Sequence, residues 1–497
     1  MSDDMYSCLV GWIGELKDGF VHQNLSLKIN GTQRGIYSTK IIRKGEMLIS
    51  LPRKNSLSGS GKPSCYSGKN VSDWLRCVAS YYECHSDNAF QPYITSLPEK
   101  YESLLEWLDE EVESFLSGTT LADLIREDRK NKVLENRFQD TVKPYLKHLN
   151  LLPSSPISLS EELDFFKKAC MCISTRGFHL NNNLNEEESL PSNSYNGPFL
   201  LPLIDLLNHD DQKKCTTLQF DASTHCFSMF AERDIASNEE IFHSYGSGLT
   251  SAQFLKTFGF VPSRSIDNAL ALKKGSEDIS PAVLSKNEVL SACQTLMDSP
   301  YSRSLIEYMK AENSYYEDEF WKMDHDCSTR DLSFLPDDFL VSAQHPLSDE
   351  LITLFAVLLM PAYVYEEFVK DGVHFVDKAI LEDYFLGKLV CQLILHVVSL
   401  KLKLFQPMLV EGLQMVENRN KDDKSILEKL HMAYRSGSER TIYGLTVRME
   451  ETFCLQSLKD EALSISRYLG GFLLNIEGLP VKAEDFNQGD KKRARIK

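Results

Sequence analysis

Two segments with the alternating pattern of short β-strands stand far apart in this chain, and they limit the folds that it can adopt. In residues 34–52, apolar and polar residues alternate on both sides of an Arg-Lys-Gly turn, which predicts two short strands. In residues 225–246, a strand is predicted at 227–231, followed by a Ser-Asn turn and a second strand at 239–245. The chain therefore contains two β pieces that are distant in sequence.

A mostly helical insertion is predicted between the two β pieces. From about residue 70 to about residue 180, apolar residues recur at helical spacing. The last of these helices is expected to begin at Ser160, with Glu162 and Asp164 as acids of the first turn. Residues 56–68 and 181–197 are predicted to be loops.

The character of the chain changes after Pro262, where long helical patterns begin. Ser348 is a suitable cap for the apolar helix that follows it, and two further long segments carry apolar residues at helical spacing. We therefore expect a second, all-helical domain. The apolar stretch from Leu389 to Leu400 is too short to cross a membrane and is predicted to be a buried helix.

The length and composition of the chain limit its domain number, its compartment and the kinds of partner that it can bind. Its 497 residues exceed what one hydrophobic core usually organises, so two or three domains are expected. The formal net charge of -17 argues against direct binding of nucleic acid and suits a basic protein partner. The acidic start and the scattered cysteines indicate no secretion signal and a reducing compartment, so we expect the cytoplasm or the nucleus. We expect a monomer with no membrane partner.

The end of the chain is strongly basic. Residues 491–497 read KKRARIK and hold five basic side chains. Such a run is typical of a nuclear localisation signal, and it is also typical of a solvated, disordered tail. Both interpretations stay open.

Four short pieces carry most of the functional information: residues 34–36, 174–176, 205–209 and 244–246. In this order, together with the segments LIDLLNHD (203–210) and IFHSYGSGLTSAQFLKTFGFV (241–261), they resemble the SET-domain methyltransferases of the Rubisco large-subunit lysine methyltransferase branch. The resemblance covers nearly the whole chain. It includes QPYITSLPEKYESLLEW (91–107), which looks like the insertion of that family, and the C-terminal helices.

This resemblance implies an α+β fold in which a SET β-fold of small sheets with knot-like threading is split by a helical insertion. An all-helical C-terminal domain that binds the substrate is expected to follow. The implied divisions are 1–55 and 166–262 for the two SET parts, 56–165 for the insertion, 263–490 for the helical domain and 491–497 for the basic tail.

The resemblance also implies S-adenosylmethionine as the cofactor. The backbone around Arg34 would hold its amino-acid end, Arg176 its carboxylate, and Asn208 its amino-acid portion, while the backbone of His209 would meet the adenine. The implied cofactor-binding residues are Gln33, Arg34, Gly35, Arg176, Asn208, His209 and Tyr245. The sequence departs from the family pattern at Gln33, where a glycine is usual, and in the long loop at 181–197.

Tyr245 matches the catalytic tyrosine of the family. Because a methyl group passes from a positively charged sulfur to a neutral amine, alignment of the reactants supplies much of the catalysis. Asp205, Phe258 and Phe260 are expected in the channel of the target lysine. Phe258 stands where the Rubisco enzyme has a tyrosine, and in related enzymes this exchange is linked to higher methylation, so di- or trimethylation is favoured.

Each of these residues also has an ordinary structural interpretation. Tyr245 could be an amphipathic residue at a strand end, and Asn208 could cap a turn. Arg176 could belong to a surface ion pair. The set His209, Cys215, His225 and Cys226 lacks the spacing of a zinc site, so no metal is expected.

Three functions remain open. The first is a protein-lysine N-methyltransferase that acts on a non-histone protein, because a cysteine-rich flank typical of histone-directed enzymes is missing. Its target would be a ribosomal protein or an elongation factor. The second is a protein-histidine N-methyltransferase of the same fold, and the third is a catalytically silent binding protein that keeps the fold as a scaffold.

Overall fold

A computed structural model of the chain describes residues 3–30, 33–85, 88–152, 158–179, 196–246, 248–270, 279–299, 330–360, 362–370, 376, 378–405 and 439–469. The chain forms two compact units. Unit 1 contains residues 1–107, 125–249 and 254–262, and unit 2 contains residues 108–124, 250–253 and 263–497. Most of the predicted loop at 181–197, and all of the basic tail, lie outside the described residues.

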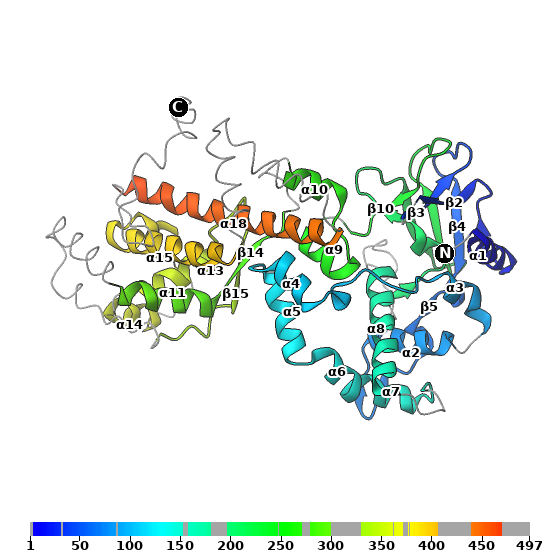
Figure 1. Cartoon of the computed structure of the whole chain (residues 1–497), viewed down its shortest axis with the longest axis horizontal. Helices are drawn as coiled ribbons and strands as arrows, with labels where there is room; N and C mark the ends of the chain where they lie inside the picture. Colours follow the sequence, from blue (N-terminus) through cyan, green and yellow to red (C-terminus); the bar gives the residue numbers. More distant parts are fainter. Residues whose placement is uncertain are drawn as a thin grey trace. The chain divides into compact units, whose positions relative to one another are not determined.

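The two predicted β pieces meet in one antiparallel sheet of unit 1. Its four strands are, in spatial order, β1 (Phe20–Val21), β4 (Met47–Pro52), β12 (Cys226–Ala231) and β11 (Thr216–Asp221). Ile49 of β4 lies opposite Met229 of β12, so the first piece pairs directly with the second across the sequence gap. Figure 1 shows this as blue and green strands side by side. Both residues belong to the buried core of unit 1.

A hairpin of β2 (Leu25–Asn30) and β3 (Gln33–Ser38) extends the first β piece. The first strand of this hairpin, β2, was not predicted, because it lies before residue 34, where the predicted β piece begins. The predicted strand at 239–245 is shorter in the structure, where only β13 (Phe242–His243) is regular. Residues 238–241 instead run antiparallel beside β3, with an isolated bridge between Tyr37 and Glu240.

The other strands of unit 1 form small pairs. β10 (Asn208–His209) pairs in parallel with β13. The region predicted as a loop at 56–68 contains short regular elements, because its backbone pairs with distant residues. These elements and their partners are η1 (Arg53–Asn55), β5 (Leu57–Ser58), η2 (Gly59–Gly61), β6 (Cys65–Tyr66), β7 (Lys69–Asn70), β8 (Gly177–Phe178) and β9 (Phe199–Leu200).

Most described helices of unit 1 lie between about residues 70 and 180, where the sequence predicted helices, whereas those at Asp3–Glu15 and Ile204–Leu206 were not predicted. The helices of unit 1 include α1 (Asp3–Glu15), α2 (Asp73–Cys84), η3 (Asn88–Phe90), α3 (Gln91–Ser96), η4 (Leu104–Glu106), α6 (Val133–Arg137), the π-turn η5 (Phe138–Val142), α7 (Lys143–His148), α8 (Leu159–Arg176) and η6 (Ile204–Leu206). The predicted start of α8 at Ser160 is wrong. Ser158 is the cap, because Glu161 stands three residues later and completes a capping box, whereas Leu163 follows Ser160 at that spacing.

The helical pattern at 119–149 is divided among several successive helices in the structure. Helix α5 (Thr120–Lys130) is separated from α6 by Lys132, which has a left-handed φ of 48°. Such a conformation ends an α-helix and turns the chain. Helix α9 (Ser251–Phe258) then follows the Tyr245 segment.

Unit 2 is mainly helical, and the three long helical segments predicted after Pro262 correspond to α13 (Asp349–Leu359), α15 (Tyr384–Lys403) and α18 (Glu439–Tyr468). Its other helices include α4 (Asp109–Leu116), α10 (Ser263–Leu270), α11 (Lys286–Asp298), α14 (Ala362–Lys370) and η8 (Lys378–Glu382). Ser348 caps α13 as predicted, accepting a hydrogen bond from the backbone of Leu351. α15 contains the apolar stretch 389–400, which is largely buried in the core of the unit.

The prediction of an all-helical second domain is wrong in one respect. Unit 2 contains an antiparallel pair, β14 (Ala282–Ser285) and β15 (Asp338–Val341). Alternate residues of both strands face the helical core, which the four-residue pattern was too short to reveal. No helix in the described part of the chain is long and apolar enough to cross a membrane.

Candidate active site

The parallel pair of β10 and β13 is the scaffold of the candidate site in unit 1. Asn208 lies opposite Phe242, and His209 lies opposite His243. Because Tyr245 follows β13 by two residues, this register returns it beside β10. The Tyr245 hydroxyl donates to the carbonyl of Leu207 at 2.7 Å, and its backbone N–H donates to Nδ1 of His209 at 3.1 Å.

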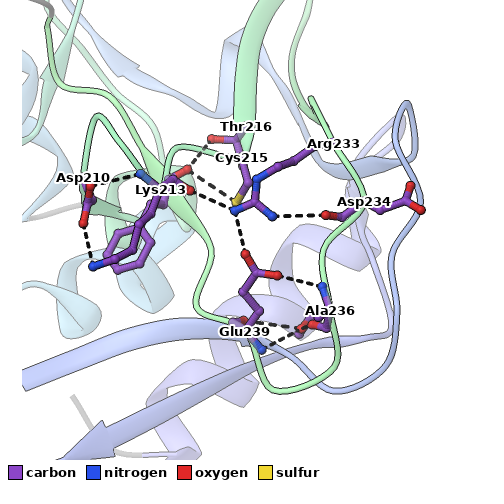
Figure 2. Close-up of polar contacts among 10 residues, drawn as sticks. Asp210, Lys213, Cys215, Thr216, Arg233, Asp234, Ala236 and Glu239 are labelled. Atoms are coloured by element: carbon purple, nitrogen blue, oxygen red, sulfur yellow. Dashed lines mark hydrogen bonds and ion pairs between the residues drawn. The ribbon is translucent and has the colours of Figure 1, made fainter.

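A polar network fixes the connections on both sides of this pair (Figure 2). Arg233 donates through Nη2 to the carbonyl of Lys213 at 3.0 Å and to Glu239 Oε1 at 2.6 Å. The other oxygen of Glu239 accepts from the backbone of Ala236 at 2.7 Å. The hydrogen bond from Arg233 holds the pKa of Glu239 below its usual range. The turn after β10 and the turn before β13 are therefore tied through one guanidinium.

Asn208 connects this scaffold to β3. Its amide nitrogen donates to the carbonyl of Arg34 at 2.6 Å and to Oε1 of Glu240 at 2.8 Å. The backbone of the predicted cofactor segment therefore lies against the predicted cofactor asparagine. Gly35 permits this approach, because an added Cβ would collide with the carboxylate of Glu240. The backbone of Gln33 pairs with Asn30, and its side chain lies outside the described part.

Arg176 ends α8 and forms a buried ion pair with Asp205. Its Nη1 donates to the carboxylate Oδ2 and to the backbone carbonyl of Asp205, both at 3.1 Å. Tyr93 donates to the same Oδ2 at 2.8 Å. Burial opposes the charge on Arg176, but Asp205 raises the pKa of Arg176 above its usual value overall. Oδ1 of Asp205 is buried and has no hydrogen-bond partner among the described residues.

Arg34 belongs to the same electrostatic cluster. Burial, and then the charge of Arg176, lower the pKa of Arg34, while Asp205 and Tyr245 favour its charged form. The two guanidinium groups are therefore close enough to repel each other. A second negative group, such as the carboxylate of a bound ligand, would relieve this repulsion.

Aromatic rings surround Tyr245 and continue into helix α9. The ring centroid of Tyr245 lies 5.0 Å from that of Phe258 and 6.3 Å from that of Phe260. His209 packs on Tyr245 at 5.2 Å and on Phe254 at 4.7 Å. These rings make an apolar wall beside the phenol, and the place of Phe258 and Phe260 in a lysine channel stays a prediction.

Burial controls the protonation of this wall. It raises the pKa of Tyr245 to about 12, while Arg176 and Arg34 act in the opposite direction. Burial also lowers the pKa of His209, and its Nδ1 accepts a hydrogen bond, so the proton of the neutral ring is on Nε2. Near neutral pH the site therefore contains a protonated phenol and a neutral imidazole, and neither is a strong base.

Two glycines shape the chain around Tyr245. Gly246 has a φ of 154° and Gly259 a φ of 81°, conformations that other residues rarely adopt. An added Cβ at Gly259 would also collide with the carbonyl of Glu102. Gly259 therefore lets Phe258 and Phe260 face the same phenol from both sides of a tight turn. The Ser174 hydroxyl donates to the carbonyl of Thr257 at 3.0 Å and ties α8 to this turn.

These groups fit the amino-acid part of a methyl donor of the S-adenosylmethionine type. Guanidinium groups suit a carboxylate, and the orphaned oxygen of Asp205 and the amide of Asn208 suit an ammonium group. Arg176 has five N–H donors, so its ion pair with Asp205 is compatible with a second carboxylate.

The structure brings the predicted residues together, while their individual roles remain predictions. Described side chains of the set converge in unit 1: Arg34, Arg176, Asp205, Asn208, His209, Tyr245, Phe258 and Phe260. Sequence reasoning missed Glu240 and Tyr93. Nothing in the local pattern singles out Tyr93, and Glu240 sits in an acidic pair that looks like a solvated turn.

Two cysteines of the zinc set that the sequence argued against contact backbone carbonyls. Cys215 contacts the carbonyl of Phe242, and the Cys226 thiol lies against the carbonyl of Thr224. Within the described ranges, no group of three or more His, Cys, Asp or Glu residues is placed to hold a metal ion.

The fold and this arrangement are similar to those of SET-domain proteins. Residues 33–246 match the SET domain family, and the match begins in β3 and ends directly after Tyr245. The matched region therefore contains both β pieces and the helical segment between them.

Two curated proteins that match this chain are lysine methyltransferases by name. The chain is 25% identical to "N-lysine methyltransferase setd6" of Xenopus laevis over 240 residues, which cover 46% of this chain and 51% of that protein. It is 25% identical to "Ribosomal lysine N-methyltransferase 4" of Saccharomyces cerevisiae over 252 residues, which cover 46% of this chain and 49% of that one. The matched region thus spans about half the length of these curated relatives.

Solved structures extend the likeness to nearly the whole chain. "Structure of Rubisco LSMT bound to AdoMet" has a TM-score of 0.61 at 15% identity, covering 94% of this chain and 93% of that one. "Crystal structure of the SET domain of LSMT bound to Lysine and AdoHcy" also has a TM-score of 0.61, with 92% of that chain covered. The fold is therefore that of Rubisco LSMT, including the helical unit that follows the SET domain.

Proposed function

We propose that this protein is an S-adenosylmethionine-dependent protein-lysine N-methyltransferase. The observation that carries the proposal is the placement of the Tyr245 phenol between the carbonyl of Leu207 and the aromatic wall of Phe258 and Phe260. The names of the relatives, which are lysine methyltransferases, support the same reaction. Arg34, Arg176, Asn208 and His209 would hold the cofactor, which supplies a methyl group on a positively charged sulfur.

The residues of the chain would contribute alignment rather than acid or base catalysis. Tyr245 keeps its proton because burial raises its pKa to about 12, so it cannot remove a proton from the amine near neutral pH. Its hydrogen bond to Leu207 holds the phenol in one orientation. The aromatic wall would exclude water around an entering lysine, and this would lower the pKa of the lysine and favour its neutral, nucleophilic form. Such positioning can supply on the order of 7 to 11 kcal/mol of the barrier.

The substrate that we propose is a non-histone protein, either a ribosomal protein or a translation elongation factor. The net charge of -17 suits a basic client, and one relative carries the name of a ribosomal lysine methyltransferase. We further propose a monomer that works in the cytoplasm, the nucleus or both. The Phe258 ring has no hydroxyl to restrain the amine, which favours di- or trimethylation.

Methyl transfer to a protein extract tests this function directly. Purified protein would be incubated with labelled S-adenosylmethionine and an extract from cells that lack it, and the labelled residue identified by mass spectrometry. We expect methyllysine in a small number of proteins. Label recovered only as methylhistidine would assign the histidine-directed activity instead. Failure to bind S-adenosylmethionine in calorimetry would leave a scaffold protein.

A further inference from the structure

The carboxylate of Glu240 lies where three separate segments of the SET domain meet. Its Oε1 accepts from the Asn208 amide at 2.8 Å, and its Oε2 accepts from the Tyr37 hydroxyl at 2.9 Å. It also packs against Gly35, where an added Cβ would collide with it. One side chain thus contacts β3 twice and β10 once.

Glu240 helps to decide which way the Asn208 amide faces. A carbonyl and a carboxylate only accept hydrogen bonds, so the NH₂ end of Asn208 must face Arg34 and Glu240. The amide oxygen consequently faces away from both. Rotating the amide by half a turn would set its oxygen against two other oxygens, and both hydrogen bonds would be lost.

Tyr37 in turn holds Glu240 in place. The hydrogen bond to Glu240, followed by burial, raises the pKa of Tyr37, so the phenol remains a donor to the carboxylate. This leaves the carboxylate with both oxygens engaged and a fixed direction toward Asn208. The hydrogen bonds from Tyr37 to Glu240 and from Asn208 to Glu240 therefore connect one end of β3 to the candidate cofactor site.

The fold does not need the Glu240 side chain to keep this segment in place. The backbone around it is joined to β3 by Ile241 N–H to Ile36 carbonyl at 2.8 Å, and by Ser38 N–H to Glu239 carbonyl at 2.9 Å. A third bond runs from Asn238 N–H to the Ser38 carbonyl at 2.9 Å. A mainly structural role is already filled by these backbone bonds.

We propose that Glu240 is a positioning residue for cofactor binding, which fixes the Asn208 amide so that its oxygen is presented to the ammonium group of the methyl donor. This inference rests on the proposed function. Tyr37 acts through Glu240, and Gly35 supplies the space that the carboxylate occupies.

Calorimetry with S-adenosylmethionine on the full chain tests the proposal. Glu240→Ala is expected to weaken binding by about tenfold or more, because a hydrogen bond to a charged group is lost. Glu240→Gln is expected to bind within about threefold of wild type, because its amide oxygen accepts from Asn208 and its NH₂ group donates to the Tyr37 oxygen. The melting temperature of the ligand-free protein should change little in either variant.

A double-mutant cycle with Tyr37→Phe separates positioning from general damage. Tyr37→Phe alone should weaken binding by less than Glu240→Ala, and adding it to Glu240→Ala should have no further effect. Glu232→Ala, which removes a surface carboxylate paired with Lys214 at 3.4 Å, is the matched control and should leave binding unchanged.

The outcomes separate this inference from the function beneath it. Wild-type protein that binds no S-adenosylmethionine would overturn both. Wild-type binding with unchanged affinity in Glu240→Ala, or weakened affinity that Glu240→Gln fails to restore, would overturn the role of Glu240 alone. Additive effects of Tyr37→Phe and Glu240→Ala on binding would likewise contradict the proposal that Tyr37 acts through Glu240.

Discussion

The hydroxyl of Tyr245 donates a 2.7 Å hydrogen bond to the carbonyl of Leu207, the residue directly before Asn208. The two residues are 38 positions apart, and the parallel register of β10 and β13 brings them together. This relationship joins the predicted catalytic group to the predicted cofactor strand. It also means that the β10–β13 pair positions both the phenol and the Asn208 amide.

Removing the Tyr245 hydroxyl should separate binding from turnover. Tyr245→Phe keeps the ring contacts with Phe258 and Phe260 but loses the bond to Leu207. We expect affinity for S-adenosylmethionine to stay close to wild type, while the rate of methyl transfer falls by about 100-fold, the usual cost of losing one oriented dipole at a reacting centre. Calorimetry and labelled methyl transfer measure the two quantities. An unchanged rate would remove Tyr245 from the mechanism.

The same residue should make stability depend on alkaline pH. The pKa of Tyr245 rises from 10.0 to about 12 on folding, mainly through burial. As the pH increases, the unfolded chain loses this proton first, so the contribution of Tyr245 is complete below pH 10 and is lost by about pH 12. Urea unfolding of wild type and Tyr245→Phe should therefore give a difference in stability that shrinks across this window. A difference independent of alkaline pH would contradict the burial of the phenol.

Breaking the ion pair of Arg176 should destabilise unit 1. Asp205→Asn leaves a buried guanidinium without its carboxylate, and we expect a loss of about 3 kcal/mol in unfolding free energy. Tyr93→Phe removes one hydrogen bond to the same carboxylate and should cost about 1 kcal/mol. Chemical denaturation measures both. Lys213→Ala, which breaks an exposed pair with Asp210, is the control and should cost less than about 1 kcal/mol.

Gly259 offers a test of the aromatic wall. Gly259→Ala introduces a side chain at a φ of 81° and pushes it against the carbonyl of Glu102, so Phe258 and Phe260 must move. We expect lower melting temperature and loss of methyl transfer. Gly45→Ala has a similar φ of 86° with open space around its Cβ, so it should show only the backbone cost of about 1 kcal/mol. Equal effects of both substitutions would mean that the contact with Glu102 is unimportant.

The Phe258 side chain should control the extent of methylation. The ring centroids of Phe258 and Tyr245 lie 5.0 Å apart. Phe258→Tyr therefore adds a hydroxyl near Tyr245, where it can hold the amine or a water molecule. We expect the product to shift from di- or trimethyllysine toward monomethyllysine, with the protein still able to bind S-adenosylmethionine. Mass spectrometry of the methylated substrate gives the distribution. An unchanged distribution would assign control of product state to another residue.

Local sequence patterns predicted the parts of the fold that depend on near neighbours. Ser348 caps α13 as expected, since the signal for a cap lies within three residues. The placement of Ser160 at the start of α8 failed for the same kind of reason, because the nearby Ser158 has the better-spaced acid in Glu161. The strand β14 was missed because four residues are too few to establish a period.

The sequence by itself determined the chemical types available to the site: a tyrosine before a glycine, an asparagine-histidine pair and two phenylalanines around Gly259. Only the tertiary structure decided that Glu240 and Tyr93 join them, since Glu240 reaches Asn208 from 32 residues away and Tyr93 reaches Asp205 from 112. Residue identity limits which bonds a side chain can form. Which partner it meets depends on long-range strand pairing and burial, and these are properties of the whole folded chain.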